Sequence, residues 1–183
     1  QQPDDIIPWF AGFRMRFFAE QDLLGEINDV WGLIGSETSD GFKQASTGDD
    51  GNQYFVPWAY YAWGIYYRKS LVEENGYEAP ADLDSLMGLA ESMQSDGITP
   101  FAFANDGQWP AMGTFDQINF RLHGYQFHVD LMAGKESWED DKVKEVFSTW
   151  AELLPMTMAD PNGRTWEEAA AALVNGEAGM MII

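Results

Sequence analysis

The segment from Tyr54 to Lys69, YFVPWAYYAWGIYYRK, carries eight aromatic side chains in sixteen residues and constrains the fold more than any other part of the sequence. One face of a half-buried strand can use only about three or four such rings as core. The remaining rings must lie where they are partly wet, and a flat apolar ring with a polar rim suits the face of a sugar. Pro57 cannot donate a hydrogen bond within a sheet, so the segment is expected to be an edge strand or a crossing between two units.

Composition excludes several classes of function. The 183-residue chain has a formal net charge of −20. Phosphate binding needs a basic surface, so nucleic acid is not expected as a partner. Solubility is the simpler interpretation of the acidity, and binding of a cationic ligand is the alternative. The absence of cysteine rules out disulfides and thiolate metal sites, and no apolar stretch reaches the roughly 18 residues of a membrane span.

Apolar spacing, capping residues and glycines predict an α/β arrangement. The expected strands are residues 5–10, 98–104 and 178–183, and residues 35–53 are expected to form an exposed loop. The expected helices are residues 13–24, 70–75, a segment capped by Asp82 or Asp84 and ended by Asp96-Gly97, and residues 109–125, 140–154 and 165–174. In the last of these, Thr165 and Glu168 form the T-x-x-E pattern of a capping box.

Four segments, taken in order, resemble one protein family. These are Val56-Pro57-Trp58 with Gly64 to Lys69, Glu74 to Leu89, Asp96 to Pro100, and Thr165 to Met180. The sequence is thereby similar to the extracellular solute-binding proteins of ABC importers, specifically the sugar-binding group that includes maltose-binding proteins. Arg68 replaces the asparagine usual in that family, and residues 81–83 replace its usual Lys-Thr-Trp.

The resemblance implies an α/β, periplasmic-binding-protein-like (type II) architecture of two lobes, of which this chain looks like an internal part. Residues 1–62 would be the end of the first section of lobe one, and residues 63–183 most of the first section of lobe two. Such proteins capture a solute on the outer side of the cytoplasmic membrane, either periplasmic or lipid-anchored, and deliver it to membrane permease subunits. A monomeric binder of carbohydrate, without a cofactor, is implied, and the number of rings favours an oligosaccharide.

In this architecture the ligand lies between the lobes and contacts loops at strand ends. The residues expected to bind it are Trp9 and Phe10 after the first strand, Tyr60, Tyr61 and Trp63 at the crossing, and Asn105, Trp109 and Asp116 in and after the loop that follows residues 98–104. Two have a simpler interpretation, Trp9 as a core residue and Asp116 as a solvated helix-surface carboxylate. The residues expected to pack in the interior are Tyr66, Tyr67, Trp31, Trp138 and Trp150.

A carbohydrate-active hydrolase is the alternative, because acidic, tryptophan-rich chains are common in that class. Asp116 paired with Asp106 or Glu136 would then supply the acid and the base. No motif fixes such a pair, so we expect a binder with no catalytic residues. A purely structural or docking module would leave the surplus of aromatic rings without a cleft to line. His123 and His128, with no third ligand nearby, are expected to be packed or at the surface rather than metal-binding.

Overall fold

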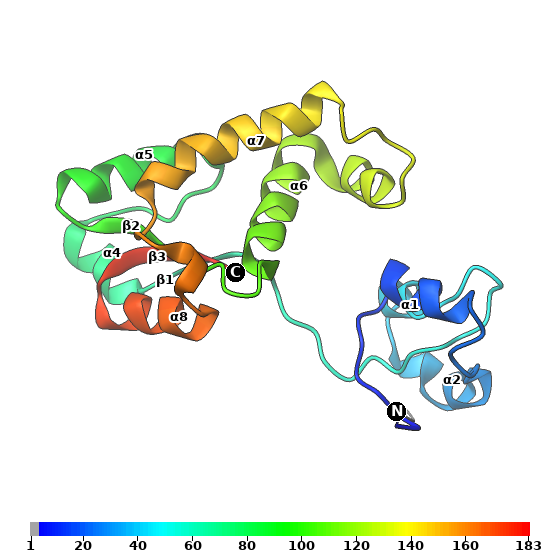
Figure 1. Cartoon of the computed structure of the whole chain (residues 1–183). Helices are drawn as coiled ribbons and strands as arrows, with labels where there is room; N and C mark the ends of the chain where they lie inside the picture. The colour runs from blue at the N-terminus through cyan, green and yellow to red at the C-terminus, as the bar shows by residue number, and fades with distance from the viewer. Residues whose placement is uncertain (1–3) are drawn as a thin grey trace. The chain divides into compact units, whose positions relative to one another are not determined.

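The computed structural model describes residues 4–183, which form two compact units, one ending at Tyr61 and the other running from Ala62 to Ile183 (Figure 1). The predicted section of lobe one covers residues 1–62, and its residues 1–3 lie outside the described range. Each unit has its own buried residues, so each is described by itself.

Unit 1 consists of short helices joined by turns. The helices are α1 (Phe13–Ala19), α2 (Asn28–Ile34), the 3-10 turn η1 (Gly35–Glu37) and α3 (Asp40–Ala45). Met15 and Trp31 are its buried apolar side chains, which confirms packing for Trp31. The Trp31 indole N–H donates to the carbonyl oxygen of Phe55 (2.7 Å), so the start of the aromatic segment is fixed to α2.

Three predictions for unit 1 are wrong. Residues 5–10 have no regular structure, because within residues 4–183 no strand lies beside them to satisfy their backbone groups. The helix predicted over residues 13–24 ends at Ala19, and Asp22 has a left-handed φ of 54°. The segment 35–53 is not a simple exposed loop, since it contains η1 and α3. Its Gln53 is buried, donating through Nε2 to Thr47 Oγ1 (2.7 Å).

Unit 2 is built on a three-stranded sheet with the order β1-β3-β2. The strands are β1 (Ile65–Tyr67), β2 (Thr99–Ala102) and β3 (Ala178–Ile182). β2 runs parallel to β3, with Phe101 opposite Met180, and β1 runs antiparallel to β3, with Ile65 opposite Ile182. Strands at residues 98–104 and 178–183 are thus confirmed. Only three residues of the aromatic segment pair as a strand, and they lie at the sheet edge.

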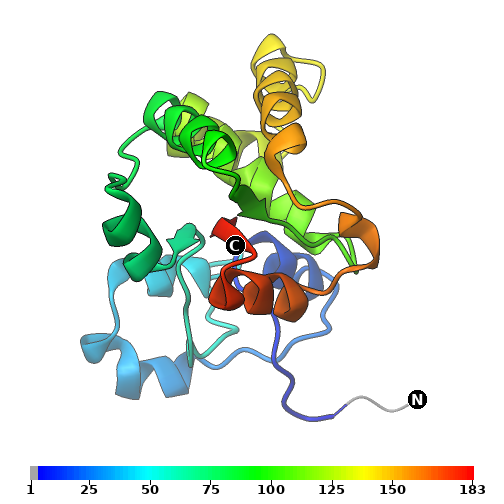
Figure 2. The same ribbon diagram turned by 90° about the vertical axis from the view of Figure 1, so that its left-hand side faces the viewer.

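Helices cover both faces of this sheet (Figures 1 and 2). They are α4 (Lys69–Asn75), α5 (Leu83–Ser95), α6 (Trp109–Met132), α7 (Asp141–Leu153) and α8 (Trp166–Asn175), with 3-10 turns η2 (Leu154–Met156) and η3 (Pro161–Gly163). Phe101 and Met180 pack into a core with α5, α6 and α7, while their neighbours Ala102 and Met181 pack into a second cluster with α8. The alternation follows from the period of two along a strand.

The helix boundaries follow the predicted caps closely. Asp82 accepts a hydrogen bond from the Ser85 N–H (2.8 Å), and Thr165 with Glu168 forms the predicted capping box. Gly76 and Gly176 end α4 and α8 in the left-handed conformation. α6 extends seven residues beyond its predicted end, because the chain resumes a helical course after a kink at Gly124 (φ 82°).

The interior predictions have mixed outcomes. Trp150 packs against the main core, as expected. The prediction that Trp138 lies in the core is wrong. Its ring stacks on that of Phe115, with centroids 5.6 Å apart, but 54% of its surface is exposed. Tyr66 and Tyr67 are also exposed, because β1 has no further strand beside it in the described part of the chain.

Candidate functional site

The loop after β2 lies at the edge of the sheet where α/β proteins bind ligands. β2 and β3 are parallel, so their carboxyl ends meet at one edge, and ligands of open α/β sheets bind outside that edge. The turn at residues 105–108 is closed by the Gln108 N–H, which donates to the carbonyl oxygen of Asn105 (3.0 Å). Gly107 and Gln108 both have left-handed φ values, 75° and 66°, which turn the chain directly into α6.

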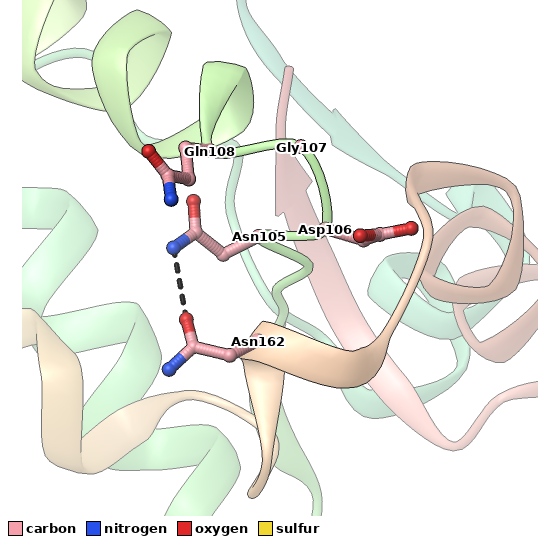
Figure 3. A pocket seen from close by; sticks show the side chains of 5 residues that line it. All are labelled: Asn105, Asp106, Gly107, Gln108 and Asn162. Carbon is pink, nitrogen blue, oxygen red and sulfur yellow. Dashed lines mark hydrogen bonds between the residues drawn. The ribbon is translucent and has the colours of Figure 1, made fainter.

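This turn borders a surface hollow of about 440 Å³ (Figure 3). Its lining is polar and consists of Asn105, Asp106, Gly107, Gln108 and Asn162. Asn105 Nδ2 donates to Asn162 Oδ1 (2.9 Å), while Asn105 Oδ1 is buried with no partner within residues 4–183. Amide groups present both donors and acceptors, which is the chemistry that binds sugar hydroxyls.

Two predicted aromatic residues lie together beside the start of α6. The rings of Trp63 and Trp109 meet edge to face, with centroids 5.7 Å apart. The Trp63 ring lies directly on the backbone of Gly113, where an added Cβ would be 2.0 Å from Trp63 Cζ2. Trp63 Nε1 is buried without a partner in the described residues, and Trp109 keeps 38% of its surface exposed.

Asp116 is placed on the same side of α6 as this pair. It follows Trp109 by seven residues, close to two full turns, with Gly113 between them on the same face. Asp116 is partly buried. Four of the predicted ligand residues therefore lie around the start and along one face of α6 in unit 2: Trp63, Asn105, Trp109 and Asp116.

The other four predicted residues, Trp9, Phe10, Tyr60 and Tyr61, belong to unit 1, and all four are exposed. Trp9 meets Phe10 and Phe18 edge to face, at 5.9 and 5.7 Å. The Arg14 guanidinium lies over the Phe10 ring, 4.9 Å from its centroid. Trp9 is therefore a surface aromatic residue, and its core interpretation is wrong.

Gln108 and Asn162 line the hollow but were not among the predicted ligand residues. The Asp160-Pro-Asn-Gly163 sequence signals a turn, and the structure has η3 there. No local signal shows that this turn meets a loop 57 residues earlier, so Asn162 was not predictable from the sequence.

Both histidines are partly buried, and packing was one of the two placements expected for them. His123 Nε2 donates to the carbonyl oxygen of Lys142 (2.9 Å) between α6 and α7. His128 Nδ1 lies 3.3 Å from Nδ2 of the buried Asn119. Within residues 4–183, no group of three His, Cys, Asp or Glu side chains is arranged to hold a metal ion. No helix in the same range is long and apolar enough to cross a bilayer.

The parallel strand pair and the helices on both faces define an α/β unit of the type that binds ligands outside the carboxyl ends of its strands. All 183 residues match the family described as bacterial extracellular solute-binding protein, and the chain belongs to that family. The predicted family and fold class are therefore confirmed.

Two relatives, from Pyrococcus horikoshii and Brucella melitensis, support this assignment. An uncharacterized ABC transporter extracellular-binding protein of Pyrococcus horikoshii is 25% identical over all of this chain and 42% of its own length. A probable sugar-binding periplasmic protein of Brucella melitensis is 27% identical over 94% of this chain and 41% of its own length. This chain thus spans less than half the length of these relatives.

Solved structures show the same fold. The bacterial solute receptor AcbH, described as having an exclusive substrate preference for β-D-galactopyranose, is 48% identical, with a TM-score of 0.83 over 95% of this chain and 45% of its own. A chitin oligosaccharide binding protein is 25% identical, also with a TM-score of 0.83, over 95% of this chain and 44% of its own.

Proposed function

We propose that this chain is part of a receptor that captures an extracellular carbohydrate between two lobes and delivers it to the permease subunits of an ABC importer. Unit 1 belongs to lobe one and unit 2 to lobe two. The observation that carries the proposal is the Trp63–Trp109 pair beside the amide-lined hollow at the carboxyl end of β2. Sugar binding combines aromatic stacking with a few placed polar groups, and both are present there.

Transport by such a receptor involves no chemistry on the ligand. A ligand that contacts both lobes favours the closed state over the open one, and the closed receptor is the form that docks on the permease. The receptor acts as a monomer on the outer side of the cytoplasmic membrane and needs no cofactor. The family and its relatives are binding proteins for transport, so the hydrolase alternative with Asp106, Asp116 or Glu136 finds no support in them.

The ligand class can be narrowed to two candidates. An oligosaccharide is the first candidate, because six predicted ligand residues have aromatic rings on which sugars could stack: Trp9, Phe10, Tyr60, Tyr61, Trp63 and Trp109. AcbH prefers galactopyranose, and its 48% identity makes D-galactose the first sugar to test.

The test is tryptophan fluorescence of the full-length protein that carries this sequence, titrated with D-galactose and with a panel of oligosaccharides. A glycoside and a soluble ester serve as substrates to detect hydrolysis. We expect a saturable shift with one sugar class and no turnover.

Matched variants then locate the binding site. Tyr61→Ala, Trp63→Ala and Trp109→Ala should each weaken binding about fivefold or more, because a stacked ring contributes about 1 kcal/mol beyond its buried area. Trp138→Ala removes an exposed tryptophan of unit 2 whose ring stacks on Phe115 and is not part of the Trp63–Trp109 pair, and it should leave affinity unchanged. Turnover of the glycoside, or no response to any sugar, would contradict the proposal.

A further inference from the structure

The turn before α8 holds the loop of the proposed ligand site. The Asn105 N–H donates to the carbonyl oxygen of Pro161 (2.8 Å), and the Asp106 N–H donates to that of Arg164 (3.1 Å). A third bond joins the side chains, from Asn105 Nδ2 to Asn162 Oδ1 (2.9 Å). Figure 3 shows the two asparagines next to each other, one from each segment, joined by this bond.

Arg164 fixes the backbone of both segments without help from Asn162. Its Nη1 donates to the carbonyl oxygen of Phe103 (2.9 Å) and its Nη2 to that of Ala159 (2.8 Å). The guanidinium therefore joins the chain just after β2 to the chain just before η3. Together with the two backbone bonds, it holds the loop in place, so the Asn162 side chain is not needed for that purpose.

The bond from Asn105 to Asn162 has a different effect, since it selects the orientation of one amide. In the structure Asn162 Oδ1 accepts, so the Asn105 nitrogen faces it and the Asn105 oxygen faces away. In Figure 3 this oxygen points toward the side-chain nitrogen of Gln108. Without Asn162, the Asn105 amide could rotate by half a turn and exchange its donor for its acceptor.

We propose that Asn162 is a positioning residue of the ligand site, which acts by fixing the amide of Asn105. The inference rests on the proposed function, because it assigns a role at the same hollow. The hollow then presents one defined pattern of donors and acceptors. Such a pattern selects among sugars that differ in the direction of a hydroxyl, since the wrong epimer leaves a polar group unpaired.

Two substitutions separate positioning from direct contact with the ligand. Asn162→Ala removes the acceptor and should weaken sugar binding about tenfold in the full-length protein, the effect of one lost hydrogen bond in the ordered site. Asn162→Asp keeps an oxygen that accepts from Asn105 Nδ2 but removes the Asn162 N–H donors. It should therefore bind within about threefold of the unsubstituted protein.

The matched control is Asn175→Ala, which makes the same change at an asparagine that bonds to Glu177 at the end of α8. It should leave affinity and selectivity unchanged. Equal loss in Asn162→Asp and Asn162→Ala would overturn the proposal and assign Asn162 to direct contact. Unchanged affinity in Asn162→Ala would overturn it as well.

An independent readout separates failure of this inference from failure of the proposed function. In the NMR spectrum without sugar, the side-chain amide protons of Asn105 should exchange slowly with solvent. Exchange should be faster in Asn162→Ala and unchanged in Asn162→Asp. If no sugar binds the unsubstituted protein, the proposed function fails and the exchange rates still decide the positioning role. Rapid exchange in the unsubstituted protein would overturn that role.

Discussion

The substitution Gly113→Ala probes the packing of Trp63 on α6. The added Cβ would lie 2.0 Å from Trp63 Cζ2 and 2.3 Å from Cη2, and ordinary contact begins at 3.4 Å. The ring must therefore shift by 1.4 Å (3.4 − 2.0), which disturbs its edge-to-face contact with Trp109. Trp63 is partly buried in a packed position, so it cannot move away without losing contacts.

Two opposing effects determine how much Gly113→Ala changes the free energy of unfolding. Alanine is more favourable than glycine inside a helix by about 1 kcal/mol. Loss of the aromatic pair costs about 0.5–1.5 kcal/mol, and overpacking costs about 1–3 kcal/mol. The two costs together exceed the gain from alanine, so the free energy of unfolding should fall by about 2 kcal/mol.

Gly88→Ala in α5 is the matched control, because nothing lies within 4 Å of the added Cβ. It should raise the free energy of unfolding by about 1 kcal/mol, so the two variants should differ by about 3 kcal/mol. Urea denaturation measures this difference, and circular dichroism measures the coupling between the two indoles. If Gly113→Ala stabilises the protein as much as Gly88→Ala does, with the coupling intact, the packing of Trp63 described above is wrong.

Three further predictions concern titration and the end of α8. The Ser85 hydroxyl and N–H hold the pKa of Asp82 below its ordinary value of 3.8, so the stabilising effect of this carboxylate is present above pH 3.8 and is lost as the pH falls. Asp82→Asn keeps the cap and should remove that dependence in acid denaturation. A hydrogen bond to the Asp96 carboxylate (2.5 Å) raises the pKa of Tyr77 to about 12, so its stabilising effect is present below pH 10 and is lost as the pH rises toward 12. Tyrosinate absorbance should show one ionisation near pH 12 that Tyr77→Phe lacks; the same titration in both proteins would contradict this. Gly176→Ala places a side chain at φ 81° with its Cβ 2.9 Å from Arg68 Nη1 and should lower the free energy of unfolding by about 1–2 kcal/mol. Adding Arg68→Ala should recover only part of that loss, because the backbone strain remains; full recovery would show that the contact alone is responsible.

The sequence predicted the parts of the fold that depend on local signals. The cap at Thr165, the cap predicted at Asp82 or Asp84 and found at Asp82, and the stop at Gly176 set helix boundaries to within a residue or two. Each works through bonds to residues three or four positions away. Arg68, a departure from the family pattern, has a long-range role that no local signal indicates. Its Nη1 donates to the carbonyl oxygen of Val174 (3.3 Å) at the end of α8.

Predictions that depend on distant partners were less reliable. The strand predicted at residues 5–10 has an apolar sequence but no neighbouring strand in the described chain, and a strand needs one. Asn105 and Trp109 were predicted as ligand residues from their position after an apolar strand, and their role stays a prediction. Asn162 depends on a contact 57 residues away, which periodicity and propensity do not encode.

The most direct test of sugar capture at the carboxyl edge of β2 is an NMR titration of the full-length protein with the sugar that gives the largest fluorescence response. We predict that the indole N–H signals of Trp63 and Trp109 shift on binding, together with the backbone amides of residues 105–108. The indole signal of Trp138 should stay in place. Shifts confined to other parts of unit 2, with residues 105–108 unaffected, would contradict the account.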